Sequence, residues 1–322
     1  MIKVCFGCGV KLQADKPENT GFIPPQKMDD SKYCQRCFKL IHYGKHQEMN
    51  TPKEVKQIIN NINKDAKFVV FLTDLLSINS ETIKIFKSIK GRKLFVISKS
   101  DIIPKSVKDA TVRDFLKNYY GLNEDIKFVS SHTNFGVEAL INYLNTRKIK
   151  ETYIVGLSNA GKSNLINAMI EKVNPKLNKL TTSNTLNTTL EFIRIPLDDN
   201  LTIIDTPGFI MSGIKFKPFT IKGAIKPKIY QMKANETLKI ENYYLSFSES
   251  TSAILYIPNE FETGKYYKEI NFTEKIKIND NEDLIINGLG FIHIKKKCNI
   301  KLANIDLGIT EVRSSIFGGF DE

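Results

Sequence analysis

The stretch "ETYIVGLSNAGKSNLINAMI" (residues 151–170) decides the fold. An apolar, strand-like run leads into GxxxxGK[ST] at Gly156, Gly161, Lys162 and Ser163, and a helical pattern follows. In such a loop backbone amides surround the β-phosphate, the lysine reaches the β- and γ-phosphate oxygens, and the serine hydroxyl binds Mg²⁺. The stretch therefore predicts a phosphate-binding P-loop. The other loop residues expected to border the nucleotide are Ser158, Asn159, Ala160 and Asn164.

Two further phosphate-site motifs are expected downstream. "IIDTPG" places Asp205 at a strand end, where it can hold a water on Mg²⁺, and Gly208 beside the γ-phosphate. This is the pattern of a Walker B/switch II segment. The threonine-rich segment between the two motifs offers Thr189, or less favourably Thr188, as a switch I ligand of Mg²⁺. The alternative is a polar loop without a ligand.

The segment "VISKSDIIPKS" (96–106), which precedes the P-loop, resembles a guanine-recognition motif. The Asp101 carboxylate can accept hydrogen bonds from N1 and the exocyclic amine of guanine, a pair that adenine lacks. Lys99 would lie across the base, and Ser98 stands where Asn is usual. In "VSSHTNFG", a backbone amide at Ser130 or Ser131 would meet the guanine O6.

Short apolar runs that end in polar residues or glycine alternate with helical patterns from about residue 50. This alternation predicts an α/β fold with a mostly parallel sheet and its chemistry at the carboxyl ends of the strands. The five nucleotide motifs occur in the order four, five, one, two, three, which predicts a circularly permuted P-loop GTPase domain over residues 49–214. The expected strands lie within 67–75, 93–101, 126–133, 151–159 and 201–208.

Two CxxC pairs near the N-terminus predict a structural zinc site in a treble-clef-like module over residues 1–48. Four thiolates close the coordination shell, so no position remains for a catalytic water. The alternatives are disulfides or chance spacing, and His42 could replace one ligand. Cys298 has no partner in sequence and is expected to be buried. The four expected zinc ligands are Cys5, Cys8, Cys34 and Cys37.

Residues 215–322 predict a β-rich, basic domain. Within 215–239 there are seven lysines and one glutamate. Lysines interleaved with aromatic residues suit RNA, through backbone contacts and base stacking; a solvated basic surface over core aromatics is the alternative. The aromatic residues concerned are Phe219, Tyr230, Tyr243 and Tyr244.

The 322 residues carry a net charge of +12, which favours a polyanionic partner or reflects a Lys-, Asn- and Ile-rich composition. At 41% hydrophobic residues the chain can fill real cores. It contains no apolar run of about 18 residues and no apolar leader, so we expect a cytoplasmic protein without a membrane partner. A monomer is the default expectation.

The zinc pairs, "SKSDIIPKS", "GLSNAGKSNLIN", "NTTL", "DTPG" and "DLIINGLGFI" occur in one order along nearly the whole chain, and in this the sequence resembles the YqeH family of circularly permuted GTPases. The resemblance implies a role in assembly of the small ribosomal subunit, with ribosomal RNA as partner. Two positions depart from the family pattern. Ser98 replaces Asn, and "LNTT" replaces Pro-Gly-Thr-Thr in switch I.

Catalysis is expected to depend on Asn159, Lys162, Thr189 and Gly208. Phe209 occupies the position of the water-orienting Gln of Ras-like enzymes, so it must point away and another group must position the water. In related GTPases with this form of P-loop, the residue corresponding to Asn159 helps hold K⁺, whose charge stabilises the phosphates. The alternative for Asn159 is a turn residue. We therefore expect slow, potassium-stimulated hydrolysis.

Three functional hypotheses follow. The first is a GTP-driven assembly factor that binds ribosomal RNA and leaves after hydrolysis. The second is a GTPase coupled to RNA modification, for which the sequence offers no nucleophile or open metal site. The third is a zinc-containing RNA-binding protein with a degenerate nucleotide site.

Overall fold

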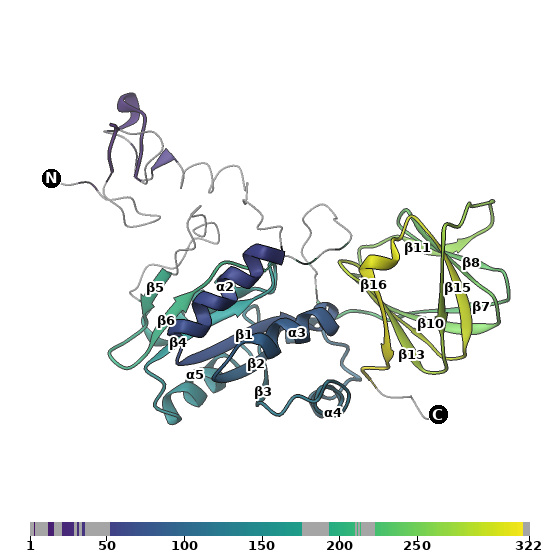
Figure 1. Cartoon of the computed structure of the whole chain (residues 1–322), viewed down its shortest axis with the longest axis horizontal. Coiled ribbons are helices and arrows are strands. Elements are labelled where there is room, and N and C mark those ends of the chain that lie inside the picture. The colour runs from purple at the N-terminus through teal and green to yellow at the C-terminus, as the bar shows by residue number, and fades with distance from the viewer. Residues whose placement is uncertain are drawn as a thin grey trace. The chain divides into compact units, whose positions relative to one another are not determined.

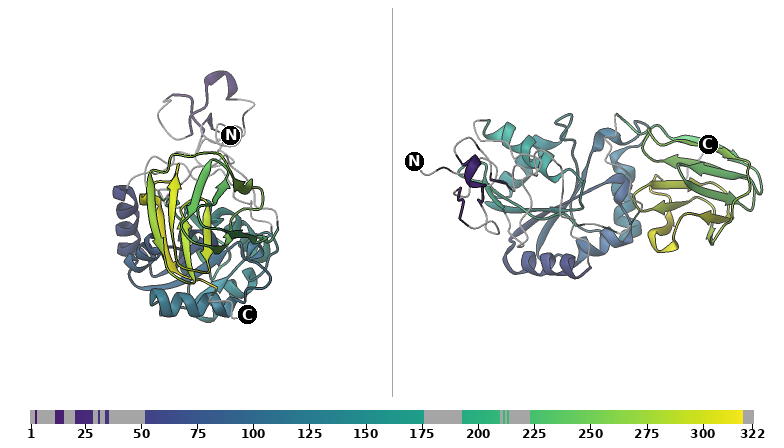
Figure 2. Two further views of the ribbon diagram at one scale, coloured as in Figure 1. Left: turned by 90° about the vertical axis from the view of Figure 1, so that its right-hand side faces the viewer. Right: turned by 90° about the horizontal axis from the view of Figure 1, so that it is seen from above.

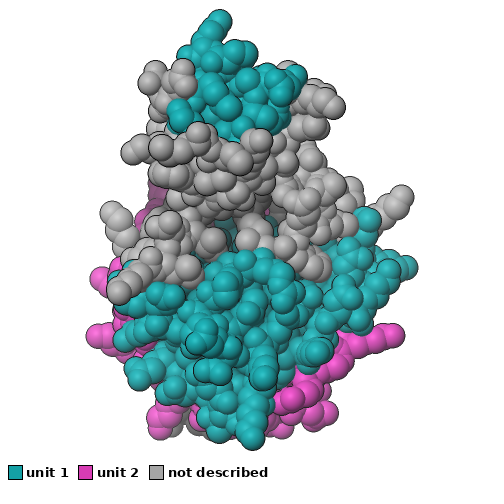
Figure 3. Space-filling view, turned by 90° about the vertical axis from the view of Figure 1, so that its left-hand side faces the viewer, with its two compact units in different colours: residues 1–70, 136–210 teal, residues 71–135, 211–322 magenta. Residues whose placement is uncertain are grey.

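The computed structural model describes residues 52–175, 193–209 and 223–317, with residues 3, 12–15, 21–28, 31, 34–35, 211 and 213. The chain forms two compact units, one of residues 1–70 and 136–210 and one of residues 71–135 and 211–322 (Figure 3). The division falls within strand β1, and each unit is described by itself. Among the described residues, no helix combines the length and apolarity that a bilayer span requires.

A six-stranded sheet has the order β3-β2-β1-β4-β6-β5 (Figure 1). In the first unit β4 and β6 are parallel, with Tyr153 opposite Ile204, and β5 is an antiparallel edge strand. The sequence-based prediction of an α/β fold is confirmed. Elements that belong mainly to the first unit are α2 (Pro52–Asp65), α5 (Val137–Thr146), β4 (Glu151–Gly156), α6 (Lys162–Val173), β5 (Ile193–Pro196) and β6 (Thr202–Asp205).

The other three strands of this sheet belong mainly to the second unit, where β2 and β3 pair in parallel. Their core contains the aromatic cluster Phe71, Phe86 and Phe95, with ring centroids 5.0 to 5.8 Å apart. β3 ends at Phe128, and a turn at residues 131–133 follows it. The elements are β1 (Phe68–Asp74), η2 (Leu75–Ser77), α3 (Ser80–Ser88), β2 (Arg92–Ser98), η3 (Ser100–Ile102), α4 (Asp109–Tyr120) and β3 (Ile126–Phe128).

The C-terminal part of the second unit consists of two five-stranded antiparallel sheets, β16-β13-β14-β10-β7 and β11-β8-β9-β15-β12 (Figure 2). Alternate residues of both sheets, such as Leu245, Leu284 and Ile300, share one apolar core. The strands are β7 (Lys228–Met232), β8 (Thr237–Ile240), β9 (Tyr243–Phe247), β10 (Thr251–Tyr256), β11 (Thr263–Tyr266), β12 (Glu274–Ile278), β13 (Glu282–Ile286), β14 (Gly290–Ile294), β15 (Cys298–Ala303) and β16 (Thr310–Ser314).

In the first of these sheets the central strands β13 and β14 are buried on both faces. Its outward side carries Asp283, His293 and Arg313, all 2% exposed or less. Asp283 accepts hydrogen bonds from His293 Nδ1 at 3.0 Å and Arg313 Nε at 3.4 Å. Arg313 also donates to the carbonyl of Ile78 and lies 5.6 Å from the ring centroid of Phe115 in α4. A buried ionic network thus joins this sheet to the nucleotide-domain half of the same unit.

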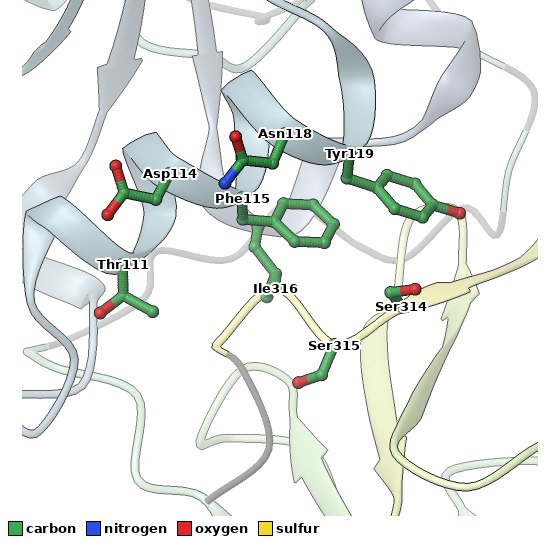
Figure 4. A pocket seen from close by; sticks show the side chains of 8 residues that line it. All are labelled: Thr111, Asp114, Phe115, Asn118, Tyr119, Ser314, Ser315 and Ile316. Carbon is green, nitrogen blue, oxygen red and sulfur yellow. The ribbon is translucent and has the colours of Figure 1, made fainter.

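A groove opens beside that contact, where α4 meets the chain that follows β16 (Figure 4). Phe115 and Tyr119 of α4 and Ile316 line it together with polar side chains. Residues 98–101 and 156–164 do not line the groove, so it is separate from the predicted nucleotide site.

Near the N-terminus the described residues form a small apolar cluster of Leu12, Ile23 and the buried Cys34. Gln13 and Phe22 make an isolated β-bridge, and η1 (Pro25–Lys27) follows. Cys5, Cys8 and Cys37 lie outside the described residues. The residues that are described contain no group of three or more potential metal ligands.

Candidate nucleotide site

The P-loop forms where β4 ends and α6 begins. Gly161 caps α6 with φ 84°, a left-handed conformation that glycine adopts without strain. Asn159 has φ 63° and an exposed side chain, and asparagine tolerates that conformation better than most residues. Ser158 and Ser163 are partly exposed, Ala160 is buried and Asn164 is exposed. The chain therefore places the free amides of a helix N-terminus at the end of β4.

Lys162 and Asp205 carry opposite charges in the interior of the first unit. The Lys162 ammonium donates to the carbonyls of Gly156 and Leu157, each at 3.3 Å. Burial lowers the pKa of Lys162 to about 8, against the attraction of Asp205. Burial also raises the pKa of Asp205 to about 6, against the attraction of Lys162. At neutral pH Lys162 therefore still carries its positive charge and Asp205 its negative charge.

Neither carboxylate oxygen of Asp205 has a hydrogen-bond partner among the described residues. A buried unpartnered carboxylate costs folding free energy, so it fits a site that is completed by a cation or its bound water. Ser163 opens α6 next to Lys162 and supplies a hydroxyl. An oxygen donor set of this kind suits Mg²⁺, which neutralises phosphate charge.

The switch II segment is fastened to the P-loop by backbone hydrogen bonds. Phe209 N–H donates to Gly156 O at 3.0 Å, and Ser158 N–H donates to Phe209 O at 2.6 Å. The Thr206 hydroxyl donates to Ile154 O at 2.9 Å. The Phe209 ring is 1% exposed. A buried ring cannot orient an attacking water, and its backbone instead ties the two phosphate motifs together.

Gly208 leaves no room for a side chain. A Cβ at this position would lie 2.7 Å from Lys162 Nζ, 2.9 Å from Ser158 Oγ and 3.2 Å from Ser158 Cα. The glycine therefore lets the switch II backbone approach the Lys162 ammonium closely. The sequence motif predicts a role for the Gly208 amide, and this packing requirement becomes visible only in the structure.

In the guanine motif, Ser98 is 3% exposed and its hydroxyl donates to Thr73 O at 3.0 Å. It therefore links the ends of β2 and β1 instead of pointing to a base. Lys99 has φ 51° and pairs with Asp74, with Nζ 2.8 Å from Oδ2. Burial raises the pKa of Asp74, but Lys99 and the hydrogen bonds from Lys99 and Ser77 outweigh it, so the pKa lies below its usual range. No sequence motif marks Asp74, which stands 25 residues before Lys99.

Asp101 is held by the serine of the next motif. Ser130 Oγ donates to Asp101 Oδ1 at 2.6 Å, and His132 Nδ1 lies 3.7 Å from Oδ2. The backbone N–H of Ser130 already donates to Phe135 O at 2.9 Å. Ser131 follows at a turn with a partly exposed side chain. The geometry thus distinguishes two residues that the sequence left equivalent: Ser130 orients Asp101, whereas the Ser131 amide donates to no described residue.

The switch I candidates Thr188 and Thr189 lie outside the described residues, as do the other residues from 176 to 192.

A family model described as RsgA GTPase matches residues 43–215, which is more than half of the chain. The Bacillus subtilis protein described as "Uncharacterized protein YqeH" is 32% identical over 278 residues, covering 80% of this chain and 76% of that protein. The chain belongs to the YqeH family of circularly permuted GTPases. As a YqeH-family GTPase it has GTP and GDP as ligands and Mg²⁺ as cofactor.

More distant similarities extend over parts of this YqeH-family chain. A model described as 50S ribosome-binding GTPase matches residues 151–288. Nitric oxide-associated protein 1 of Mus musculus is 23% identical over 255 residues, and the match covers 60% of this chain but 36% of that protein. The crystal structure of YjeQ from Thermotoga maritima matches 45% of this chain and 49% of its own, at 28% identity and a TM-score of 0.33.

Proposed function

We propose that the protein is a GTP-driven switch that assists assembly of the small ribosomal subunit. The observation that carries the switch is the backbone pairing of Phe209 with Gly156 and Ser158. A γ-phosphate that displaces the P-loop or Gly208 moves the same backbone. The chain then continues directly to Met211, whose sulfur lies 3.2 Å from the Thr82 hydroxyl oxygen, and to Gly213.

Gly213 leads into the C-terminal sheets of the second unit. A Cβ on Gly213 would lie 2.7 Å from the carbonyl oxygen of Asn287, so the segment after switch II packs closely on β13 and its turn. The Asn287 side chain accepts from Asn79 Nδ2 at 2.8 Å, just before α3. Because the permuted order places this segment directly after switch II, nucleotide state can bias the C-terminal module.

For the nucleotide, we propose that Asp101, Lys99 and the Ser131 amide bind guanine while the P-loop binds the phosphates. Lys162 would contact the β- and γ-phosphates, and Ser163, Asp205 and, in switch I, Thr189 would hold Mg²⁺ or its waters. The Lys162 and Asp205 environment within the first unit, and the Asp101–Ser130 hydrogen bond within the second, support this function over a degenerate nucleotide site.

Potassium is the proposed stimulating ion. Asn159 projects from the P-loop in a left-handed turn and its exposed side chain forms no hydrogen bond with the described residues, so it is available to a cation. Hydrolysis should be faster in potassium than in sodium at equal ionic strength, and Asn159→Ala should remove that difference while retaining GTP binding. Equal rates of the unaltered protein in both salts would contradict the proposal.

We also propose that Cys5, Cys8, Cys34 and Cys37 bind one structural zinc ion within residues 1–48. Cys34 is buried against Leu12 and Ile23, which suits a ligand of a closed site. Atomic absorption of the purified protein should give about one zinc per chain, and Cys34→Ser should reduce it. Zinc-free protein with unchanged stability would contradict this assignment.

The ribosomal partner is proposed from the family and from the basic β-rich region, taken as residues 215–322 beyond a GTPase domain of residues 49–214. The protein is proposed to act as a cytoplasmic monomer. Co-sedimentation with purified small and large ribosomal subunits, with GDP or a non-hydrolysable GTP analogue, tests this function. Binding to the small subunit only with the analogue is expected. Preference for the large subunit, which the name of one matching family model mentions, would refute the assignment.

A further inference from the structure

One face of the C-terminal sandwich has no covering element among the described residues. In the sheet β11-β8-β9-β15-β12, the inward residues such as Leu238, Leu245 and Ile300 fill the common core. Successive side chains of a strand alternate between faces, so their neighbours point outward. The strand registers then identify an outer face that includes Lys239, Tyr244, Tyr266, Lys275, Lys277 and Lys301.

Three lysines form a strip along β12 and β15. Lys275 is directly opposite Lys301, and Lys277 is two residues further along β12 on the same face. All three are exposed, and none makes an ion pair with another described residue. Like charges at directly opposed positions destabilise a sheet, and a bound anion would offset this repulsion. Lys239, by comparison, has Glu262 3.8 Å away.

Tyrosines occupy the other side of the same face. Tyr244 of β9 and Tyr266 of β11 have ring centroids 4.8 Å apart. Tyr244 is opposite Ala303 of β15, so a small residue separates the tyrosines from the lysine strip. With strands about 4.8 Å apart, roughly 10 Å separates β9 from β12.

The aromatic residues that the sequence analysis grouped together do not all lie on this face. Tyr230 and Tyr243 pack against the core of the sandwich, as the alternative interpretation expected, and Phe219 lies outside the described residues. Tyr244 remains, and Tyr266 of β11 joins it.

We propose that this outer face binds single-stranded RNA, with the lysine strip on the phosphates and Tyr244 and Tyr266 stacking on bases. The proposal rests on the proposed ribosomal function and names its RNA-binding surface. Positive charge beside aromatic rings on an open sheet is the combination that single-stranded nucleic acids require. The strip contains no apolar residue of the kind that forms the core of a protein interface.

The test uses the full chain and a fluorescein-labelled, unstructured RNA of about 20 nucleotides, with anisotropy measured over a series of potassium chloride concentrations. The strip variant is Lys275→Gln/Lys277→Gln/Lys301→Gln. Its matched control removes the same charge from exposed helix positions, as Lys84→Gln/Lys117→Gln/Lys172→Gln. Loss of three phosphate contacts should lower the slope of log affinity against log salt by about 2, whereas the control should keep the slope.

A stacking pair provides an independent readout. Tyr244→Ala should weaken RNA binding about tenfold, and Tyr244→Phe, which keeps the ring, should bind as the unaltered protein does. GTP hydrolysis without RNA should be unchanged in all these variants, which shows that the nucleotide domain is folded.

The outcomes separate the two proposals. If the unaltered chain binds RNA and the strip variant behaves like its control, the assigned surface is wrong while the ribosomal function stands. If the chain binds the small subunit but not free RNA, the face does not bind single-stranded RNA and the inference is overturned. If the chain binds neither the small subunit nor free RNA, both the ribosomal function and the RNA-binding surface are refuted.

Discussion

Replacing Gly208 by alanine should disable the phosphate site with little effect on folding. The added Cβ would lie 2.7 Å from Lys162 Nζ, whereas ordinary contacts of a Cβ begin near 3.4 Å. The lysine or the switch II backbone must therefore move by roughly 0.7 Å or more. Ser158 Cα, at 3.2 Å, belongs to the backbone and limits the movement of the chain. A misplacement of about 1 Å at a reacting centre costs on the order of 100-fold in rate.

The assay is single-turnover GTP hydrolysis, with GTP affinity and thermal unfolding measured in parallel. Gly208 does not have a positive φ, so alanine adds no backbone strain and the unfolding midpoint without nucleotide should change little. Gly264→Ala is the matched control, because a Cβ there meets nothing within 4 Å. Hydrolysis by Gly208→Ala at the unaltered rate and affinity would show that Lys162 is not confined as described. A large loss of stability would show that the clash acts on folding instead.

Three further predictions concern charged groups. Burial raises the pKa of Asp205 from 3.8 to about 6, so the folded protein loses stability as the pH rises through that range and the carboxyl group ionises. Without nucleotide, Asp205→Asn should therefore be more stable than the unaltered protein at pH 7, by at most about 3 kcal/mol. The same variant should lose Mg²⁺-dependent GTP binding. An unchanged unfolding midpoint from pH 5 to 7 in both proteins would contradict it. Asp101→Asn should lose GTP affinity and gain affinity for xanthosine triphosphate, whose O2 accepts from an amide, as competition binding can show; retained preference for GTP would remove Asp101 from the base site. Arg313→Met leaves Asp283 buried without its guanidinium partner and should lower the free energy of unfolding in urea by about 3–5 kcal/mol. The double variant Asp283→Asn/Arg313→Met should lose less stability than the sum of the two single variants. Additive losses would argue against the ion pair.

Local motifs explain how much of the nucleotide site could be predicted. Binding of phosphate and metal sets the spacing of Gly161, Lys162 and Asp205 along the chain. A strand before the P-loop and a helix after it complete the motif. The permuted order is visible in the sequence for the same reason. Ser98 shows the limit of this approach, because the partner of its hydroxyl, Thr73 O, lies 25 residues away and carries no sequence signature.

By itself the sequence determined the family, the P-loop, the order of the nucleotide motifs and the α/β and β-rich composition, since these follow from short-range patterns. Tertiary structure decided that Phe209 is buried and joined to the P-loop, that Arg313 and Asp283 form a buried pair, and that Tyr244 faces outward while Tyr243 faces the core. The two tyrosines are adjacent and chemically identical. Only strand register, set by pairing with distant strands, assigns each to a face, because a shift of one residue exchanges the two sides of a sheet.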